Sequence, residues 1–327
     1  MTDRLDLLRQ WTHRQLAWPA VALVPASSDA SFRRYFRVSD GNDSFILMDA
    51  PPEQEDCQPF IHVSELMLQL GLHVPQVIAS DLEQGFLLLS DLGSRSYLEA
   101  LDDTTVDRLY GDAMGALLAL QSCVTPDCGL PAYDRTLLLD EMGLFRDWLL
   151  GRHLGIELDS TQAAELDACF DRLADSALAQ PRVCVHRDYH SRNLMVCDHN
   201  PGILDFQDAV IGPVTYDLVS LLRDCYISWP QERIEDWVSG YYELALQSGI
   251  MRGEQGSEAD FMRWFDWMGV QRHLKAAGIF ARLNHRDGKP GYLADIPRTL
   301  GYVREVCAGY PELALVGELA GNVIRAL

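Results

Sequence analysis

The sequence predicts an α+β fold in which a small β-rich N-terminal lobe is followed by a larger α-rich C-terminal lobe. Up to about residue 90, short runs of β-branched and aromatic residues alternate with turn signals. From about residue 104 onward, long stretches with helical periodicity dominate. The change falls just after Asp91-Leu92-Gly93. We therefore expect two lobes, residues 1–91 and residues 92–327.

The N-terminal lobe is expected to combine several strands with two helices. Amphipathic spacing predicts one helix over residues 5–17 and a second over 60–70, which Gly71 ends. The turn signal Asp40-Gly41-Asn42-Asp43 separates two of the strands. The expected strands cover residues 21–24, 35–38, 45–48, 77–79 and 86–89.

The C-terminal lobe is expected to be helical apart from one group of short strands. A strand over 183–185 is followed by a second over 194–196, which returns antiparallel as 203–204. The turn between the last two reads Asp198-His199-Asn200-Pro201-Gly202. The expected helices cover residues 104–123, 136–153, 160–178, 216–222, 232–247, 258–283 and 296–308.

The composition limits the class of protein. The chain has 327 residues, 48% of them hydrophobic, and a net charge of −21, which argues against a general binder of nucleic acid or anionic membranes. Lys275 and Lys289 are its only lysines. Eight scattered cysteines without a C-x-x-C pair suit a reducing compartment. With no apolar leader and no run of eighteen apolar residues, we expect a soluble cytoplasmic protein.

One segment, 183–208, carries three polar side chains in a distinctive order. Asp188 is followed by Asn193 and then by Asp205, and the strand pairing predicts that Asp205 returns beside Asn193. An amide oxygen and a carboxylate together suit a hard cation such as Mg²⁺. The order matches H-R-D-x-x-x-x-N followed by D-F, the pattern of kinase-type phosphoryl transfer. A chance loop rich in Asp and Asn is the alternative, but the ordered set between two strands favours the functional interpretation.

Phosphoryl transfer needs positioning, a metal that offsets phosphate charge, and an acceptor for the hydroxyl proton. Asp188 is therefore the candidate catalytic base, and Asn193 and Asp205 are the candidate ligands of nucleotide-bound Mg²⁺. His186 and His190 are four residues apart, but their loop context and the lack of further ligands argue against a zinc site.

These residues resemble the aminoglycoside phosphotransferase and choline kinase family, which has a protein-kinase-like two-lobe fold. The catalytic loop resembles the small-molecule H-x-D-x-x-x-x-N, Asp205 is followed by Phe-Gln-Asp rather than by F-G, and no A-P-E motif follows. The resemblance implies an enzyme that uses ATP and Mg²⁺, with a nucleotide-binding lobe over 1–91 and a catalytic and substrate-binding lobe over 92–327. Asp217 resembles the acid that braces the catalytic loop from a helix start in this family.

Other blocks resemble the bacterial anomeric sugar kinases of cell-wall recycling. These blocks are residues 27–38, 45–52, 87–93, 271–275, 278–283 and 286–289. The resemblance covers nearly the whole chain. It implies ATP-dependent phosphorylation of the anomeric hydroxyl of N-acetylmuramate and N-acetylglucosamine in peptidoglycan recycling. The sugar 1-phosphate would then pass to a downstream nucleotidyltransferase.

One position departs from the wider fold. A lysine on the third strand normally holds the nucleotide phosphates and pairs with a helix glutamate, whereas this chain has Met48 there and Glu65 would lack that partner. Since the guanidinium fork suits phosphate, Arg33 or Arg34 is the candidate replacement. Two surface arginines beside a strand are the alternative.

Backbone groups are expected to supply other nucleotide contacts. The loop before the second strand has no G-x-G-x-x-G, but Ser28 and Ser31 could offer small side chains and N–H groups to phosphate. An ordinary turn is the alternative. Ser90 and Leu92, in the connection between the lobes, offer amide groups to adenine, with an ordinary linker strand as the alternative.

A cation should face the acceptor, because N-acetylmuramate carries a carboxylate. The candidate substrate-binding residues are His190, Gln207, Asp208, Arg223, Arg272 and Lys275. Gln271 and Lys275 share a helix face, for which exposure to solvent is the alternative.

Two other functions stay open at this stage. A phosphotransferase for aminoglycosides or other small alcohols would fit the acidic chain, because aminoglycosides are polycations. A non-catalytic nucleotide-binding relative would explain the missing strand lysine, although Asp188, Asn193 and Asp205 are all retained. The sequence favours the anomeric sugar kinase over both.

Overall fold

The computed structural model describes residues 3–18, 21–28, 32–123, 128–252 and 256–327. Its contacts divide the chain into two compact units. The first comprises Met1–Ser96 with Leu194–Asp208, and the second comprises Tyr97–Asn193 with Ala209–Leu327. The expected ranges 1–91 and 92–327 are continuous, whereas the first unit also includes a short hairpin from later in the chain. The assignment of nucleotide binding and catalysis to those two ranges stays a prediction.

The first unit is built on a five-stranded antiparallel sheet with the order β1-β2-β3-β5-β4. Its strands are β1 (Val24–Ser28), β2 (Arg34–Ser39), β3 (Ser44–Asp49), β4 (Val77–Asp81) and β5 (Phe86–Ser90). Its helices are α1 (Arg4–Leu16) and α2 (Gln58–Gln69). The strand expected over 21–24 is wrong, because Val21 and Leu23 pack against the core while strand pairing begins at Val24.

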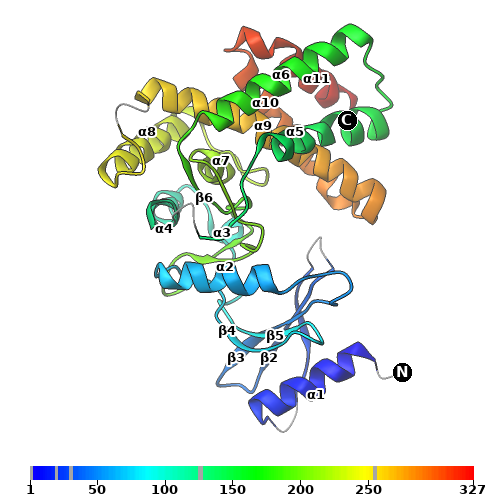
Figure 1. Ribbon diagram of the computed structural model, residues 1–327, viewed down its shortest axis with the longest axis vertical. Helices are drawn as coiled ribbons and strands as arrows, with labels where there is room; N and C mark the ends of the chain where they lie inside the picture. The colour runs from blue at the N-terminus through cyan, green and yellow to red at the C-terminus, as the bar shows by residue number, and fades with distance from the viewer. Residues whose placement is uncertain (1–2, 19–20, 29–31, 124–127, 253–255) are drawn as a thin grey trace. The chain divides into compact units, whose positions relative to one another are not determined.

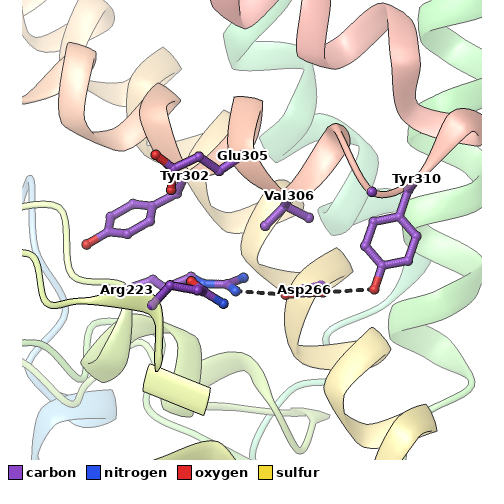
Figure 2. Close-up of a pocket in the computed structure, with 8 residues that line it drawn as sticks. Arg223, Asp266, Tyr302, Glu305, Val306 and Tyr310 are labelled. Atoms are coloured by element: carbon purple, nitrogen blue, oxygen red, sulfur yellow. Dashed lines mark hydrogen bonds and ion pairs between the residues drawn. The ribbon is translucent and has the colours of Figure 1, made fainter. Parts of the chain in front are cut away.

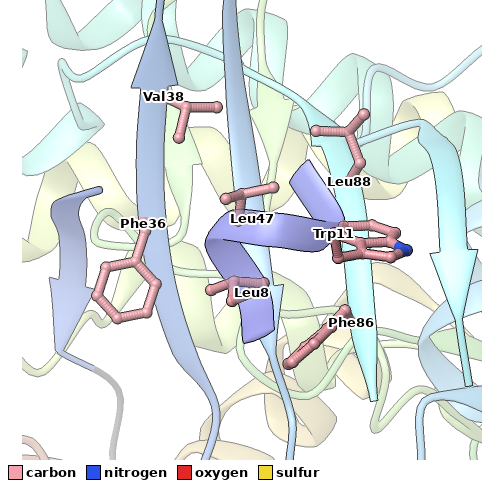
Figure 3. Packing of buried hydrophobic residues seen from close by; sticks show 7 residues of the cluster. All are labelled: Leu8, Trp11, Phe36, Val38, Leu47, Phe86 and Leu88. Carbon is pink, nitrogen blue, oxygen red and sulfur yellow. The ribbon is translucent and has the colours of Figure 1, made fainter. Parts of the chain in front are cut away.

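Helix α1 packs on one face of this sheet. Leu8 and Trp11 of α1 are buried against a cluster from β2, β3 and β5, in which Leu47 is fully buried (Figure 3). The rings of Trp11 and Phe86 lie 5.8 Å apart. Because neighbouring side chains on a strand point to opposite faces, the buried Met48 points away from α1. Figure 1 shows α1 beside the strands of this unit.

A short hairpin completes the first unit. It consists of β7 (Leu194–Met195) and β8 (Gly202–Ile203), slightly shorter than the strands expected there. The N–H of Ile203 donates to the carbonyl of His73 at 2.8 Å, and that of Val196 donates to Arg95 at 2.9 Å. The ring of Phe206 lies 4.8 Å from that of Phe60 in α2. These contacts explain why the hairpin groups with the N-terminal sheet.

The second unit is mainly helical. Its helices are α3 (Tyr97–Ala100), α4 (Val106–Cys123), α5 (Arg135–Leu144), η1 (Phe145–His153), α6 (Ser160–Leu178), α7 (Tyr216–Leu222), α8 (Gln231–Gln247), α9 (Glu258–Asp287), η2 (Pro290–Asp295), α10 (Ile296–Cys307), η3 (Pro311–Leu313) and α11 (Ala314–Ala326). An antiparallel pair joins β6 (Arg182–Val185) to β9 (Val210–Pro213). Most helices were expected, and the helical stretch predicted over 136–153 is confirmed as α5 and η1, although its second half is a π-helix.

Helix α9 is the central element of the second unit (Figure 1). It has 30 residues, begins with a capping box at Ser257 and ends at Gly288 in the left-handed region, with φ of 65°. It packs against α5, α6, α7, α8 and α10. At Gly278 a Cβ would lie only 2.4 Å from the backbone carbon of Leu144, so only glycine allows the two helices to approach this closely. No described helix is long and apolar enough to cross a membrane.

Candidate active site

The loop that carries Asp188 is braced from below by Asp217. Asp217 lies in the first turn of α7 and is fully buried. Its two carboxylate oxygens accept hydrogen bonds from the backbone N–H of His186 at 2.6 Å and of Arg187 at 3.0 Å. Arg187 has a φ of 79°, a conformation that costs a non-glycine residue about 1–3 kcal/mol and that these bonds help to hold. The predicted bracing role of Asp217 is confirmed.

The loop also closes on itself around Asp188. The N–H of His190 donates to the carbonyl of Asp188 at 3.0 Å, and the side-chain amide of Asn193 donates to the same carbonyl at 3.0 Å. The N–H of Asn193 donates in turn to His190 at 2.9 Å. Since the amide nitrogen of Asn193 is the donor, its side-chain oxygen is the atom suited to a cation. Asp188 and Asn193, the two motif residues in the second unit, therefore stabilise the same loop conformation.

Positive charges keep Asp188 ionised. Burial alone would raise the pKa of its carboxyl, but nearby cations lower the pKa below its ordinary value. The permanent cations among them are Lys275, Arg272 and Arg187. Burial lowers the pKa of His190, so its imidazole is neutral at pH 7. Asp188 is thus a carboxylate at neutral pH, which is the form that a general base requires.

The sequence did not single out Glu141, although it organises the cations behind Asp188. Glu141 is 6% exposed and pairs with Lys275 at 3.1 Å and with Arg187. Lys275 also donates to the hydroxyl of Tyr216 at 2.9 Å, and Gln271 donates to Glu141 at 3.3 Å. Gln271 and Lys275 therefore share a helix face as predicted, and the alternative of a solvent-exposed face is wrong. A lone glutamate in a helical stretch carries no sequence signal of this role.

Arg223 and Arg272 are buried as well. Arg272 is 5% exposed and contacts the thiol of Cys225 at 3.7 Å. Arg223 is 2% exposed and pairs with Asp266 at 2.8 Å, and the same carboxylate accepts a bond from Tyr310 at 2.8 Å (Figure 2). Arg223, Asp266 and Tyr310 line a pocket of about 560 Å³. The sugar contacts predicted for Arg223, Arg272 and Lys275 stay predictions, and the structure gives Arg223 and Lys275 ionic partners within the protein.

Asp205 lies in the first unit and has a φ of 64°, which short polar residues tolerate better than most. One of its carboxylate oxygens accepts a hydrogen bond from the side-chain amide of Gln207 at 2.8 Å. Gln207 is buried and Asp208 is exposed. Gln207 therefore orients the candidate metal ligand, and its predicted contact with sugar hydroxyls stays a prediction, as does that of Asp208.

The same unit distinguishes Arg33 from Arg34. Arg34 donates to the fully buried carboxylate of Asp49 with two of its nitrogens. Arg33 pairs with Glu55 at 3.0 Å. Burial opposes the charge of Arg33, yet its pKa is raised by Tyr35, Glu55, Asp208 and Asp205. Arg33 is therefore paired with Glu55, and the charges of Asp208 and Asp205 also favour its charged form, whereas Arg34 is bonded within the sheet to Asp49.

The predicted adenine contacts lie in a firmly held connection. The N–H of Ser90 donates to Gln76 at 3.0 Å, and the hydroxyl of Ser90 accepts from the N–H of Gln76 at 2.9 Å. Asp91 accepts two bonds from Arg37, at 2.6 and 2.9 Å. Leu92 is 7% exposed. The roles of Ser90 and Leu92 stay predictions, and the N–H and hydroxyl of Ser90 are already used within the sheet.

Two further predictions fall at the limits of the structure. Ser31 lies outside the described residues, and the side chain of Ser28 does as well.

Among the described residues, no group of three or more His, Cys, Asp or Glu side chains is placed to hold a metal. Mg²⁺ commonly uses one or two protein ligands together with substrate phosphates and water, so an amide and a carboxylate fit this cation.

The fold is that of small-molecule kinases. Aminoglycoside phosphotransferase APH(2'')-Ib with bound ADP superimposes with a TM-score of 0.57, covering 90% of this chain and 97% of that chain at 14% identity. Choline kinase LicA from Streptococcus pneumoniae gives 0.57, covering 93% and 99% at 14% identity. These similarities confirm the predicted two-lobe fold, with its small antiparallel sheet and larger helical part.

The family follows from the sequence itself. Residues 22–254 match the phosphotransferase enzyme family, and the chain belongs to that family. It is 52% identical over 305 residues to the N-acetylmuramate/N-acetylglucosamine kinase of Pseudomonas aeruginosa, covering 93% of this chain and 89% of the relative. It is 44% identical to the kinase of the same name from Neisseria meningitidis, covering 96% of each.

Proposed function

We propose that this protein transfers the γ-phosphoryl group of ATP to the anomeric hydroxyl of N-acetylmuramate and N-acetylglucosamine. The observation that carries the proposal is the braced loop, in which Asp217 and Asn193 fix the backbone around an ionised Asp188. The names of the relatives at 44% and 52% identity support the choice of sugars.

In this proposal Asp188 orients the anomeric hydroxyl and accepts its proton as the oxygen attacks phosphorus. An anomeric hydroxyl is more acidic than an ordinary alcohol, so a carboxylate of low pKa is an adequate base. The hydroxyl oxygen forms the new bond to the γ-phosphorus, the bond to the bridging oxygen breaks, and ADP leaves with that electron pair. The products are the sugar 1-phosphate and ADP.

The nucleotide side of the site is assigned from the motif. Asn193 and Asp205 would hold Mg²⁺, which when bound offsets the charge of the phosphates. We assign Arg33 to the phosphates, because the charges of Asp205 and Asp208 act on it and its partner Glu55 is less buried than Asp49, the partner of Arg34. Leu92, with the backbone of Ser90, is assigned to adenine.

The product suggests the place of the reaction in metabolism. Sugar 1-phosphates are substrates for nucleotidyltransferases, which form nucleotide sugars by attack of the phosphate on a nucleoside triphosphate. A kinase for these two sugars would return peptidoglycan fragments to that route. Because ATP is the donor, we place the reaction in the cytoplasm.

Phosphorus NMR tests the proposal. Purified protein is incubated with ATP, Mg²⁺ and each sugar in turn, with the Asp188→Asn variant as the control. The expected result is a new signal coupled to the anomeric proton, absent with the variant. No product from either sugar would overturn the sugar assignment, and a panel of aminoglycosides and other alcohols would then test the alternative. Nucleotide binding without turnover across the whole panel would indicate a non-catalytic protein.

A further inference from the structure

Arg192 is the cation of the catalytic loop that faces solvent. It lies four residues after Asp188, and its side chain is 43% exposed. Its guanidinium carbon lies 3.6 Å from the centre of the Tyr226 ring and 5.8 Å from that of Tyr292. In the described part of the chain its ionic partner is Asp295, at 4.0 Å and beyond hydrogen-bond distance. The guanidinium is therefore held by its face, and its N–H edge can bind a ligand.

One buried carboxylate fixes this arrangement next to the loop. Asp224 is 1% exposed and accepts a bond from the N–H of Ser191 at 2.9 Å and another from the N–H of Tyr226 at 2.8 Å. The loop and the aromatic ring are thus held to each other through a single side chain. Tyr292 is supported from behind by Phe280, whose ring is stacked on it at 5.6 Å.

The arrangement lies close to the reacting centre. The ring of His190, two residues after Asp188, lies 5.2 Å from that of Tyr226. Burial lowers the pKa of His190, against the opposing charges of Asp224 and Asp188. Its Nδ1 is buried and has no hydrogen-bond partner among the described residues. The contact between His190 and Tyr226 therefore places the ring that holds Arg192 next to the catalytic loop.

The other cations near this loop are already paired or buried. Lys275 is bonded to Glu141 and Tyr216, and Arg187 is bonded to Glu141 as well. A carboxylate on the acceptor would have to break these pairs to use either of them. Arg192 needs no such exchange, because the one ionic contact that it makes with the described residues is 4.0 Å long.

We infer that Arg192 binds the lactyl carboxylate of N-acetylmuramate, with Tyr226 holding the guanidinium in place, and so sets the preference between the two sugars. The inference rests on the proposed function. N-acetylmuramate differs from N-acetylglucosamine by a lactyl ether that carries a carboxylate, and a guanidinium can bind that group through two parallel N–H donors. N-acetylglucosamine has no such group, so Arg192 contributes to its binding only through general contact.

The test compares kcat/KM for both sugars in wild type and in Arg192→Gln. We expect a loss of roughly 10- to 100-fold for N-acetylmuramate and less than about threefold for N-acetylglucosamine. The methyl ester of N-acetylmuramate removes the charge from the substrate instead of from the protein, which completes a double-mutant cycle. In wild type, esterification should lower kcat/KM about as much as Arg192→Gln does. In the Arg192→Gln variant, esterification should change kcat/KM little. Arg298→Gln is the matched control, because Arg298 also contacts Asp295, at 3.2 Å, without a ring contact to Tyr226.

The outcomes separate the inference from the function it rests on. Phosphorylation of both sugars with an unchanged ratio in Arg192→Gln would overturn the role of Arg192 and leave the kinase standing. An equal loss for both sugars would also overturn it, since it would mean that Arg192 only maintains the loop. If wild type phosphorylates neither sugar, the proposed function fails and the inference fails with it. Tyr226→Leu should lower the ratio in the same direction as Arg192→Gln.

Discussion

Two groups of cations surround the catalytic loop, and they differ in how they are held. Behind Asp188, Lys275 and Arg187 share the buried carboxylate of Glu141. At the front, Arg192 is exposed over an aromatic ring, with its carboxylate partner at 4.0 Å. Removing ions from water is so costly that the first group must be paired within the protein. The second group costs little to leave open, which makes it the one suited to a ligand.

The N-terminal unit shows that exposure of the cation is not enough to decide its role. The side chain of Arg34 is 45% exposed, yet it is bonded to Asp49, which is fully buried and also binds Arg4. Arg33 is less exposed but acts on Asp205 and Asp208. The partner of Arg33, Glu55, is 13% exposed, whereas the partner of Arg34 is fully buried, so Arg34 is the more costly of the two cations to release.

The largest effect is expected from Asp188→Asn, because this carboxylate is the candidate base and the buried cations behind it hold it ionised. The amide keeps the shape of the side chain but cannot accept the proton. We expect kcat to fall by ~10²–10⁴-fold with each sugar, measured in a coupled ADP assay. Activity within threefold of wild type would remove Asp188 from the role of base.

Glu141→Gln tests the buried group directly. The substitution leaves Lys275 and Arg187 buried together without their carboxylate, which should lower the free energy of unfolding by about 3–5 kcal/mol in urea titrations. Asp295→Asn, which removes the partner of Arg192, should cost less than about 1 kcal/mol because that pair is long and partly exposed. Similar losses in the two variants would contradict the distinction between a paired and an open group.

Arg33→Ala and Arg34→Ala extend the comparison to the nucleotide. If Arg33 binds phosphate, its removal should raise KM for ATP roughly tenfold, since one charge-assisted hydrogen bond contributes about that much. Arg34→Ala should leave KM for ATP within about twofold and lower stability instead, because Asp49 would lose a partner. An unchanged KM in Arg33→Ala would show that another group replaces the lysine absent at Met48.

The motif and most of the helices could be predicted from the sequence because they depend on local pattern, and the brace because Asp217 resembles the bracing acid of the family. Helix α6 begins and ends where its periodicity indicates, and the structure shows a capping box at Asp159. The partners of the cations could not be predicted, because Glu141 meets Lys275 only through the packing of α5 against α9. Arg192 was missed for the same reason. Its position in the loop was visible, but Tyr226 and Tyr292 become its neighbours only in the folded unit.

The smallest effect concerns the pH dependence of the brace. Burial raises the pKa of Asp217 to about 7, although the N–H groups of His186 and Arg187 favour the charged form. In the unfolded chain this carboxyl has a pKa near ~4. Between these two values the folded protein holds a proton that the unfolded chain has lost. The contribution of Asp217 to stability therefore decreases as pH rises from about 4 to about 7.

Other groups act in the same window, so the measurement must be a difference. His273, whose pKa burial lowers to about 3, makes the folded protein more stable as pH rises, and it does so equally in wild type and in Asp217→Asn. From pH 5 to pH 6, the free energy of unfolding of wild type minus that of Asp217→Asn should fall by about 1 kcal/mol. A difference that does not change with pH would mean that the two N–H bonds outweigh burial. The brace would then be an ionised carboxylate throughout this range, and its charge would be a fixed part of the field around Asp188.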